Sequence, residues 1–523
     1  MQTLPLGPFL GINNRLPDFA LNVKDKGSYL RAADNVEVTN AGNVVRRKAP
    51  VLLQAMTAPH SLYGSFFVRA SVLYKAAFAP YSETLVKVLS SNDLMSYAVI
   101  NGDTYYSNGT DSGRISAAGT YYPWALPTPA APTVTPTTGT LFKGWYQVAV
   151  GYVNSVTGEE GGVSASTNYH LTADGGLLIT LPAATTGATH INVYVSTVNG
   201  SIPMLQTTVA TGTASVTINT HTLGRESNQR YEAPLPAGTR LFVHNGRLCS
   251  VKGKDLFYSL PYRPGYYLPA ENRIPFPEDV SIAVPNQGGV YVASDKTYFF
   301  AGQDLGAVEV VRDVLPYGAV PGTEFSVPNK TLAGWFGEKG VVLATPDGQV
   351  EAVMSDNIDL TPPDSGFSVV LETRGYRRVV SCGWCLNLDS LAATTYSDWG
   401  ITSASGGYGT KADGIYTLEG EGTVDAFVDL GRQNFGAENL KHMPACYLSV
   451  ASPEPMMLRV TTPSGDEYDY LARSSDENLV VQRVDVGKGL RENYYGLKVY
   501  NTEGSDFTLA SVSFAPVASG RRI

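Results

Sequence analysis

The stretch GVYVASDKTYFF, residues 289–300, decides the fold class of this chain, because it describes a hairpin with apolar side chains on both faces. In its first strand, Val290 and Tyr291 point to opposite faces, and both side chains are apolar or aromatic. Ser294-Asp295-Lys296 suits a tight reversal. A single hairpin cannot cover two apolar faces. We therefore expect similar sheets to stack on both sides of it.

Two other stretches repeat the pattern: GRLCSVKGKDLFYS, residues 246–259, and GVVLATPDGQVEAV, residues 340–353. Their first residues lie 43 positions before Gly289 and 51 positions after it. These intervals agree with the roughly 40–50 residues of one propeller blade. The repetition predicts a β-propeller-like body of four to six blades, with a two-sheet sandwich as the alternative fold.

Composition favours short strands joined by turns. Charged residues make up 16% of the 523 residues, against about 25% in a typical soluble protein, and the chain holds 53 Gly, 32 Pro and 31 Tyr. Low charge with abundant Tyr is also typical of surfaces that partners cover, although a Tyr-rich core is the simpler explanation. The net charge of −9 argues against a clamp on nucleic acid phosphates, but it suits a surface past which DNA slides.

The domain organisation follows from changes of rhythm. A Pro-rich linker at residues 123–139 precedes about six short strands, a pattern that resembles a fibronectin type III module. The hairpin rhythm resumes near Arg240, so this module is inserted in the body. We predict an all-β, multi-domain fold. Its parts are an N-terminal platform segment (1–59), a propeller-like body (60–125 plus 236–380), an inserted β-sandwich (126–235) and a C-terminal β-rich domain (381–523).

Motifs that carry chemistry are few. Cys382-Gly-Trp-Cys385 could join His442 and Cys446 in a zinc site, but at strand spacing these cysteines read better as small apolar residues. The acidic run SGDEYDY, residues 464–470, reads as a solvated hairpin rather than a cation site. No nucleophile elbow, phosphate loop or EF-hand is present. We expect no enzyme, no metal and no cofactor, although spacing cannot reveal two distant glycosidase carboxylates.

The start of the chain carries a family resemblance. GPFLGINNR, residues 7–15, and YLRAADNVEVTNAGNVVRRKAP, residues 29–50, resemble the opening of tail hub or nozzle proteins of short-tailed bacteriophages, also called packaged-DNA-stabilisation proteins. The shared elements are a Gly-Ile-Asn triplet, an Asn-Val pair, a glycine and an arginine pair. In this chain they are Gly11-Ile12-Asn13, Asn35-Val36, Gly42 and Arg46-Arg47. The inserted sandwich departs from the simplest members of that family.

The resemblance implies a structural virion protein of a phage tail, assembled in the host cytoplasm. It implies a homo-oligomer, usually a hexameric ring, below portal and adaptor proteins. Such a ring surrounds the DNA channel without sequence-specific binding, retains the packaged DNA and docks tail fibres or spikes. We expect no secretory leader and no membrane span. A host-glycan-binding appendage or tail-fibre protein is the alternative function, and a carbohydrate-active enzyme is a third.

A basic segment is the candidate partner site. Between Asn13 and Pro50 the chain has seven Lys or Arg against four Asp or Glu. We expect Arg31, Arg46, Arg47 and Lys48 to face the acidic portal or adaptor assembly. A solvated strand end is the alternative interpretation.

Overall fold

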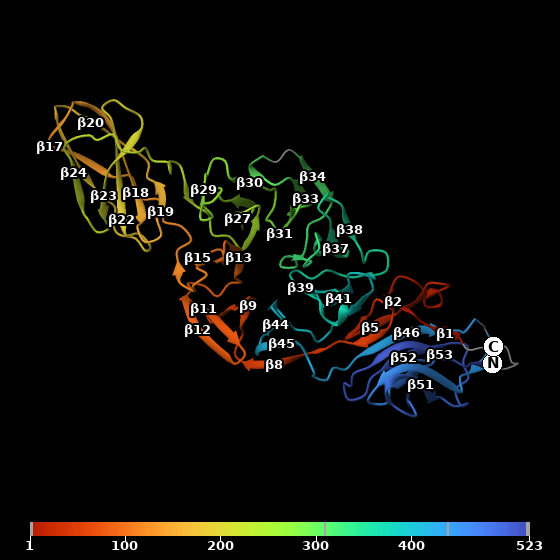
Figure 1. The fold of residues 1–523 in the computed structure, drawn as a ribbon. Coiled ribbons are helices and arrows are strands. Elements are labelled where there is room, and N and C mark those ends of the chain that lie inside the picture. The colour runs from red at the N-terminus through yellow and green to blue at the C-terminus, as the bar shows by residue number, and fades with distance from the viewer. Residues whose placement is uncertain (1–3, 308–309, 437–438, 519–523) are drawn as a thin grey trace. The chain divides into compact units, whose positions relative to one another are not determined.

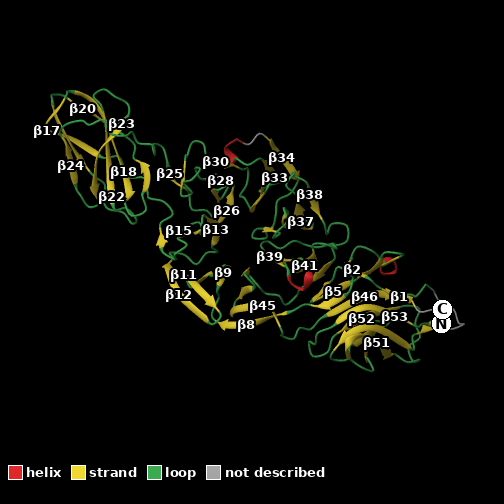
Figure 2. Ribbon diagram, in the orientation of Figure 1, coloured by secondary structure: helices red, strands yellow, loops and turns green. Residues whose placement is uncertain are grey.

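The computed structural model describes residues 4–307, 310–436 and 439–518. Strands make up 52% of the structure and helices 2%, which confirms the predicted all-β, multi-domain fold (Figure 2). The ends of the predicted first and last domains, residues 1–3 and 519–523, lie outside the described residues. The helical segments described are single 3-10 turns: η1 (Asp18–Ala20), η2 (Leu305–Ala307) and η3 (Thr373–Gly375).

The chain divides into two compact units. Unit 1 comprises residues 1–84, 286–299 and 312–523, and unit 2 comprises residues 85–285 and 300–311. This division is coarser than the four domains expected from the sequence, whose boundaries remain a prediction.

Four-stranded sheets, the repeating element of a propeller-like fold, recur along the described chain (Figure 1). In pairing order, they are β12 (Tyr81–Val88), β11 (Val72–Phe78), β10 (Phe66–Arg69) and β9 (His60–Tyr63); β13 (Ser96–Ile100), β14 (Asp103–Ser107), β15 (Ser112–Ile115) and β16 (Tyr121–Tyr122); β26 (Arg240–His244), β27 (Arg247–Lys252), β28 (Asp255–Tyr258) and β30 (Arg273–Pro275); β31 (Ile282–Asn286), β32 (Gly289–Ala293), β33 (Thr297–Ala301) and β34 (Val310–Leu315); β35 (Phe325–Ser326), β36 (Ala333–Gly337), β37 (Gly340–Ala344) and β38 (Val350–Ala352); and β43 (Ser403–Ser405), β44 (Tyr408–Lys411), β45 (Gly414–Gly420) and β8 (Ala49–Ala55).

The repeat is more regular than the sequence suggested. The hairpins β27–β28 and β32–β33 are strands two and three of their sheets, but β37–β38 are strands three and four. The equivalent second strands begin at Arg247, Gly289 and Ala333, 42 and 44 residues apart. The sequence interval of 51 residues runs from the second strand of one sheet, β32, to the third strand of the next, β37. It is longer than one repeat for that reason.

Burial on both faces of these hairpins is confirmed. Every residue of β32 and of β36 is buried. Within unit 1, the ring of Tyr291 on β32 lies 5.4 Å from that of Trp335 on β36, so the two sheets pack face to face. The Tyr291 hydroxyl donates to the backbone oxygen of Thr345 at 2.5 Å, which satisfies its one polar atom.

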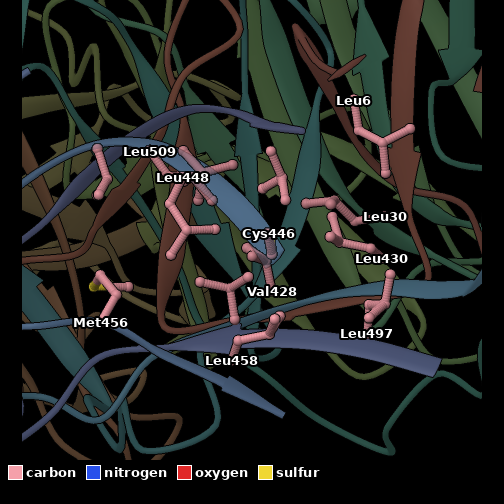
Figure 3. Close-up of a cluster of buried hydrophobic side chains, with 14 of the residues drawn as sticks. Leu6, Leu30, Val428, Leu430, Cys446, Leu448, Met456, Leu458, Leu497 and Leu509 are labelled. Atoms are coloured by element: carbon pink, nitrogen blue, oxygen red, sulfur yellow. The ribbon is translucent and has the colours of Figure 1, made fainter. Parts of the chain in front are cut away.

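Two larger sheets of unit 1 form what we call the C-terminal sandwich, and their facing side chains build one core (Figure 3). The nine-stranded sheet runs β39 (Ser368–Leu371), β40 (Arg378–Ser381), β41 (Trp384–Asn387), β42 (Ala393–Thr395), β5 (Ala32–Asp34), β46 (Phe427–Gln433), β52 (Tyr495–Tyr500), β49 (Met457–Thr461) and β50 (Glu467–Leu471). The other runs β51 (Asp476–Asp485), β48 (Ala445–Ser452), β53 (Thr508–Phe514), β7 (Val44–Arg46) and β6 (Val36–Val38), with β1 (Leu4–Leu6) on β53. Smaller sheets beside it are β2 (Phe9–Ile12), β4 (Gly27–Leu30) and β3 (Asn22–Val23), and the pair β47 (Lys441–His442) and β54 (Val517–Ala518).

The N-terminal segment supplies strands to several sheets of unit 1. β5 lies in the nine-stranded sheet between β42 and β46, and β6 and β7 complete the other sheet of the sandwich. β8 pairs with β45 as the outer strand of a four-stranded sheet. The segment therefore ties the C-terminal sandwich to the propeller-like body.

Unit 2 contains the inserted sandwich, here residues 133–218. One sheet is β17 (Thr133–Leu141), β21 (Gly175–Thr180) and β24 (Ser215–Ile218), and the other is β19 (Glu159–Val163), β18 (Gly144–Asn154), β22 (His190–Ser196) and β23 (Pro203–Ala210), with β20 (Thr167–Leu171) on β18. Alternating residues such as Val148 and Val193 fill a core made only of residues 126–218. The short pair β25 (Ala233–Pro234) and β29 (Tyr266–Tyr267) follows it in the same unit.

Candidate functional site

The family-like motif at the start of the chain folds around one buried asparagine, Asn35. Its backbone is left-handed, with φ of 56°, a conformation that Asn tolerates better than most residues. The side chain is 2% exposed, accepts a hydrogen bond from Arg47 Nε at 2.7 Å and donates to the backbone oxygen of Asp425 at 2.9 Å. Asn35 thus joins β5, β7 and the segment before β46.

An open cavity of about 360 Å³ lies beside this asparagine, on the C-terminal sandwich of unit 1. It gathers three carboxylates, two cations, two amides and two aromatic rings. Its lining residues are Asp34, Asn35, Asp398, Asp425, Ala426, Phe427, Arg459, Lys498, Tyr500 and Asn501. We take this cavity as the candidate site, because concave surfaces with a few convergent polar groups are where proteins bind small ligands.

The two cations of the cavity are held in place. Arg459 donates to Asp469 at 2.8 and 2.9 Å and to Glu467 at 2.6 Å. These charge-assisted bonds lower the pKa of Asp469 and raise that of Arg459. Lys498 Nζ lies 3.4 Å from the centre of the Phe427 ring, a cation–π contact. The acidic run near residue 467 therefore lies in the hairpin that the sequence predicted. Its carboxylates accept hydrogen bonds from Arg459.

The three carboxylates of the cavity differ in exposure and in the hydrogen bonds that they accept from the chain. Asp34 accepts hydrogen bonds from Thr395 Oγ1 at 2.7 Å and Ser397 Oγ at 2.5 Å. Asp398 and Asp425 are exposed residues. Together, these groups can accept hydrogen bonds from a hydroxyl-rich ligand, while the rings of Phe427 and Tyr500 offer apolar faces. With three carboxylates against two cations, the cavity does not favour a polyanion.

The four basic residues predicted to bind a partner have partners within the chain. Arg46 and Arg47 are 3% and 2% exposed. Arg46 pairs with Asp506 at 3.3 Å, and Arg31 forms an ion pair with Asp18. Lys48 lies 3.2 Å from Glu421. A partner's charge could therefore reach only Arg31 and Lys48, whose side chains are 26% and 22% exposed, and their role stays a prediction.

Arg47 illustrates what spacing alone hides. Its guanidinium lies 5.2 Å from the ring centre of Tyr396 and 5.7 Å from that of Trp399, and burial lowers its pKa. An arginine pair at the end of an amphipathic strand looks like a surface patch. Here the aromatic rings that cover it come from residues some 350 positions later in the chain, so no local signal announces its burial.

Three of the residues considered as zinc ligands lie on different strands, with His442 on β47. Cys385 lies on β41 and Cys446 on β48, and both are buried. Burial raises the pKa of the Cys385 thiol to about 12, so it stays protonated at neutral pH. Within the described residues, no three His, Cys, Asp or Glu side chains gather as ligands of one metal ion.

The cavity could not be predicted from the sequence, since its lining residues are spread between positions 34 and 501. Of its lining residues, Asp34 and Asn35 belong to the stretch that carries the family resemblance. The described part of the chain contains no helix long and apolar enough to span a membrane.

No known protein family matches the chain, and no curated protein does. Among solved structures, an exo-β-1,3-galactanase from Phanerochaete chrysosporium aligns with 92% of this chain and 99% of its own, at 10% identity and a TM-score of 0.20. A glycoside hydrolase family 43 arabinoxylan arabinofuranohydrolase from Bacillus subtilis covers 90% of this chain and 96% of its own, at 11% identity and a TM-score of 0.17. A Cry1Da tryptic core variant from Bacillus thuringiensis covers 76% and 53%, at 13% identity and a TM-score of 0.16.

This comparison contradicts the sequence-based prediction that the chain is not an enzyme, because two of these three similar structures are enzymes. We withdraw that exclusion. With TM-scores of 0.20 or lower, the similarity assigns neither an activity nor a substrate. It also leaves the resemblance to tail hub proteins untested.

Proposed function

We propose that this chain is a structural protein of a bacteriophage tail, a hub or nozzle. Copies of it form a ring around the DNA channel, retain the packaged DNA and dock the tail fibres. The ring contacts the portal or adaptor on one side.

The observation that carries this proposal is the structural use of the motif behind the family resemblance. Gly42 has φ of +78°, and a Cβ there would lie 2.5 Å from the Pro8 side chain. Gly11 has φ of +89°, and a Cβ there would meet the backbone of Ala393 at 2.6 Å. Asn35 and Arg47 form the buried hydrogen bond described above. The motif therefore consists of residues that this architecture needs, which supports a shared architecture rather than a chance match.

Exposed apolar side chains support assembly into a ring. The outermost strands of the two sheets in the C-terminal sandwich, β50 and β51, carry Leu471 and Leu479 at 53% exposure and Val481 at 67%. Edge strands with apolar side chains invite pairing with another chain. We assign this apolar edge, Leu471, Leu479 and Val481, to a neighbouring copy.

The acidic balance supports a channel that DNA does not stick to. The net charge is −9, and a protein that grips DNA phosphates would carry a basic excess instead. Repulsion between the chain and DNA keeps the contact weak and lets the duplex move.

The test is the oligomeric state of the purified full-length chain, measured by mass photometry and negative-stain electron microscopy. We expect closed rings, six-fold in the simplest case. The double variant Leu479→Glu with Val481→Glu should dissociate them. Val156→Glu, which alters an exposed residue between β18 and β19, should leave them intact. A chain that stays monomeric at tens of micromolar, or a double variant that still forms rings, would contradict the proposal.

A second candidate function is a host-glycan-binding appendage, and the cavity beside Asn35 favours it. Carboxylates, amides and aromatic faces are the groups that hold sugar hydroxyls and the apolar faces of sugar rings. Trimers in the same measurement would point to this function. A glycan microarray with wild-type chain and the Asp425→Ala variant would then show whether binding depends on the cavity.

A further inference from the structure

The geometry points to a second ligand site, in unit 2, that accepts a sugar carrying a carboxylate. It consists of residues of unit 2 alone, so it holds whether or not the chain forms rings. The site is a cavity of about 200 Å³. Its lining combines four aromatic rings with two arginines and a glutamate, and comprises Tyr105, Arg114, Trp124, Thr157, Gly158, Glu159, Tyr262, Arg263, Pro264, Gly265 and Tyr266.

Tyr262 is the residue that marks this cavity. Its side chain is 97% exposed, although a tyrosine is large and partly apolar. Its backbone has φ of +58°, which is an outlier for a bulky residue and disfavours every side chain other than that of Gly, Asn or Asp. Residues in strained backbone conformations are enriched at ligand sites, so Tyr262 is a candidate contact because it also lines a cavity.

Backbone hydrogen bonds connect the two ends of the loop that carries Tyr262. The Leu260 amide donates to Tyr266 O at 2.8 Å, and the Tyr266 amide donates to Arg263 O at 3.0 Å. Gly265 lets the loop approach Trp124, because a Cβ there would lie 2.0 Å from the Trp124 backbone oxygen. The exposed ring therefore stands on a hydrogen-bonded turn, and such bonds reduce the entropy that a loop loses on binding.

The polar groups beneath the ring are organised for recognition. The Tyr266 hydroxyl donates to Glu159 Oε1 at 2.7 Å, and Arg114 lies 3.8 Å from Glu159 Oε2. The Nε of Arg114 is buried and has no hydrogen-bond partner within the described residues. Its ion pairs, at 3.7 and 3.8 Å, are longer than a charge-assisted hydrogen bond.

The charged residues that line the cavity indicate which class of sugar it can bind. Two arginines and one glutamate line the cavity, and Arg263 is also tied to Glu232 at 2.7 Å. Arg114 lies over the Tyr122 ring at 5.3 Å and keeps only long ion pairs with Asp103 and Glu159, so its terminal guanidinium nitrogens are the group that a ligand carboxylate can engage. The ring of Tyr262 can stack on the apolar face of a pyranose. These features together fit a uronic acid or another carboxylated sugar.

The test uses the full-length chain and three probes: D-glucuronic acid, its methyl ester and D-glucose. Saturation-transfer difference NMR and isothermal titration calorimetry measure binding. We expect glucuronic acid to bind better than its ester, and the ester no better than glucose. No saturation transfer from the chain to glucuronic acid at millimolar concentration, or equal affinity for acid and ester, would overturn the proposal.

Two variants locate the site. Tyr262→Gly should reduce the affinity for glucuronic acid about tenfold, while it raises the melting temperature by relieving the left-handed strain. Tyr231→Gly is the matched control, since Tyr231 is also exposed (74%) and left-handed (φ of 71°) but does not line the cavity. It should raise the melting temperature and leave the affinity unchanged. Equal losses of affinity in the two variants would overturn the assignment.

Discussion

The inserted sandwich of unit 2 and the C-terminal sandwich of unit 1 share a two-sheet plan but draw on the sequence differently. All strands of the inserted sandwich lie between Thr133 and Ile218. The C-terminal sandwich combines β1, β5, β6 and β7 with strands that begin at Ser368 or later. The first can therefore be recognised in one continuous stretch of sequence. The second requires pairing between the two ends of the chain, which no local pattern shows.

We expect the largest effect from two deletions, one that removes strands of the C-terminal sandwich and one that removes the inserted sandwich. Removal of residues 1–55 takes away β1 to β8, so we expect unit 1 to lose its cooperative unfolding transition and its near-ultraviolet circular dichroism. Replacement of residues 129–231 by a short Gly-Ser linker should leave unit 1 folded, because Thr128 Oγ1 already lies 3.4 Å from the Glu232 backbone oxygen. A folded unit 1 without residues 1–55 would contradict this dependence on the N-terminal strands.

Glu37 on β6 should give the next largest effect. It is 2% exposed, accepts a hydrogen bond from the Tyr396 hydroxyl at 2.5 Å, and pairs with Arg378 at 2.9 Å. Glu37→Gln removes one of the two carboxylates that pair with the buried Arg378, the other being Glu419, so we expect a loss of at most about 3–5 kcal/mol in the free energy of unfolding measured in urea.

The matched control for Glu37 lies in the inserted sandwich. Glu160 on β19 forms an ion pair with Arg225, whose side chain is 43% exposed. Glu160→Gln should cost less than about 1 kcal/mol, since exposed pairs contribute little. A similar loss of unfolding free energy in Glu37→Gln and Glu160→Gln would contradict this difference. It would mean that water reaches the charge of Arg378 in unit 1.

Two asparagines with left-handed backbones, one in each sandwich, should differ in the same direction but by a smaller free energy. Asn35→Ala removes the acceptor of Arg47 and forces Ala into positive φ, so we expect a loss of about 2–3 kcal/mol. Asn199, also left-handed with φ of 55°, is exposed and accepts a hydrogen bond from the Trp145 amide. Asn199→Ala should cost about 1 kcal/mol. Thermal and urea unfolding of both variants measure the difference, and a reversed order would contradict the role given to Asn35.

The smallest effect concerns pH. Because Arg459 lowers the pKa of Asp469 in the folded state, the pair stabilises fully above the unfolded pKa, about 3.9, and this contribution is lost as pH falls through the lower folded pKa. The Asp469 side chain is 36% exposed, so less than about 1 kcal/mol is at stake. Asp469→Asn should lower the urea midpoint of unit 1 slightly at pH 7 and match wild type near pH 2. A difference that persists unchanged at pH 2 would exclude this origin.

The comparison also explains which parts of the fold could be predicted. Hairpins such as β32–β33 follow from two apolar faces around a polar turn, because both signals are local. The strand β8 could not be placed in the sheet of β45 from its sequence, since its partner lies several hundred residues away. The same reason hid Arg47, which reads as part of a basic patch until Tyr396 and Trp399 are brought over it.

The candidate sites were harder to predict than the fold. Asp34 ends β5, whereas Asp398 and Asp425 lie in two separate loops, and carboxylates at such positions are usually solvated. Tyr262 could have drawn attention only through its neighbours, since Tyr-Arg-Pro-Gly looks like an ordinary turn. Positive φ at a tyrosine is a property of the folded backbone and leaves no trace in the residue order.

The pairing of β8 with β45 sets the order in which a newly made chain can mature. Ribosomes add about 5–20 residues per second, so Ala49–Ala55 leaves the ribosome on the order of tens of seconds before its partner strand exists. The inserted module, by contrast, can close as soon as Ile218 has emerged. A truncated or stalled product would hold one finished module attached to an unfinished, apolar remainder, the material that chaperones and proteases act on.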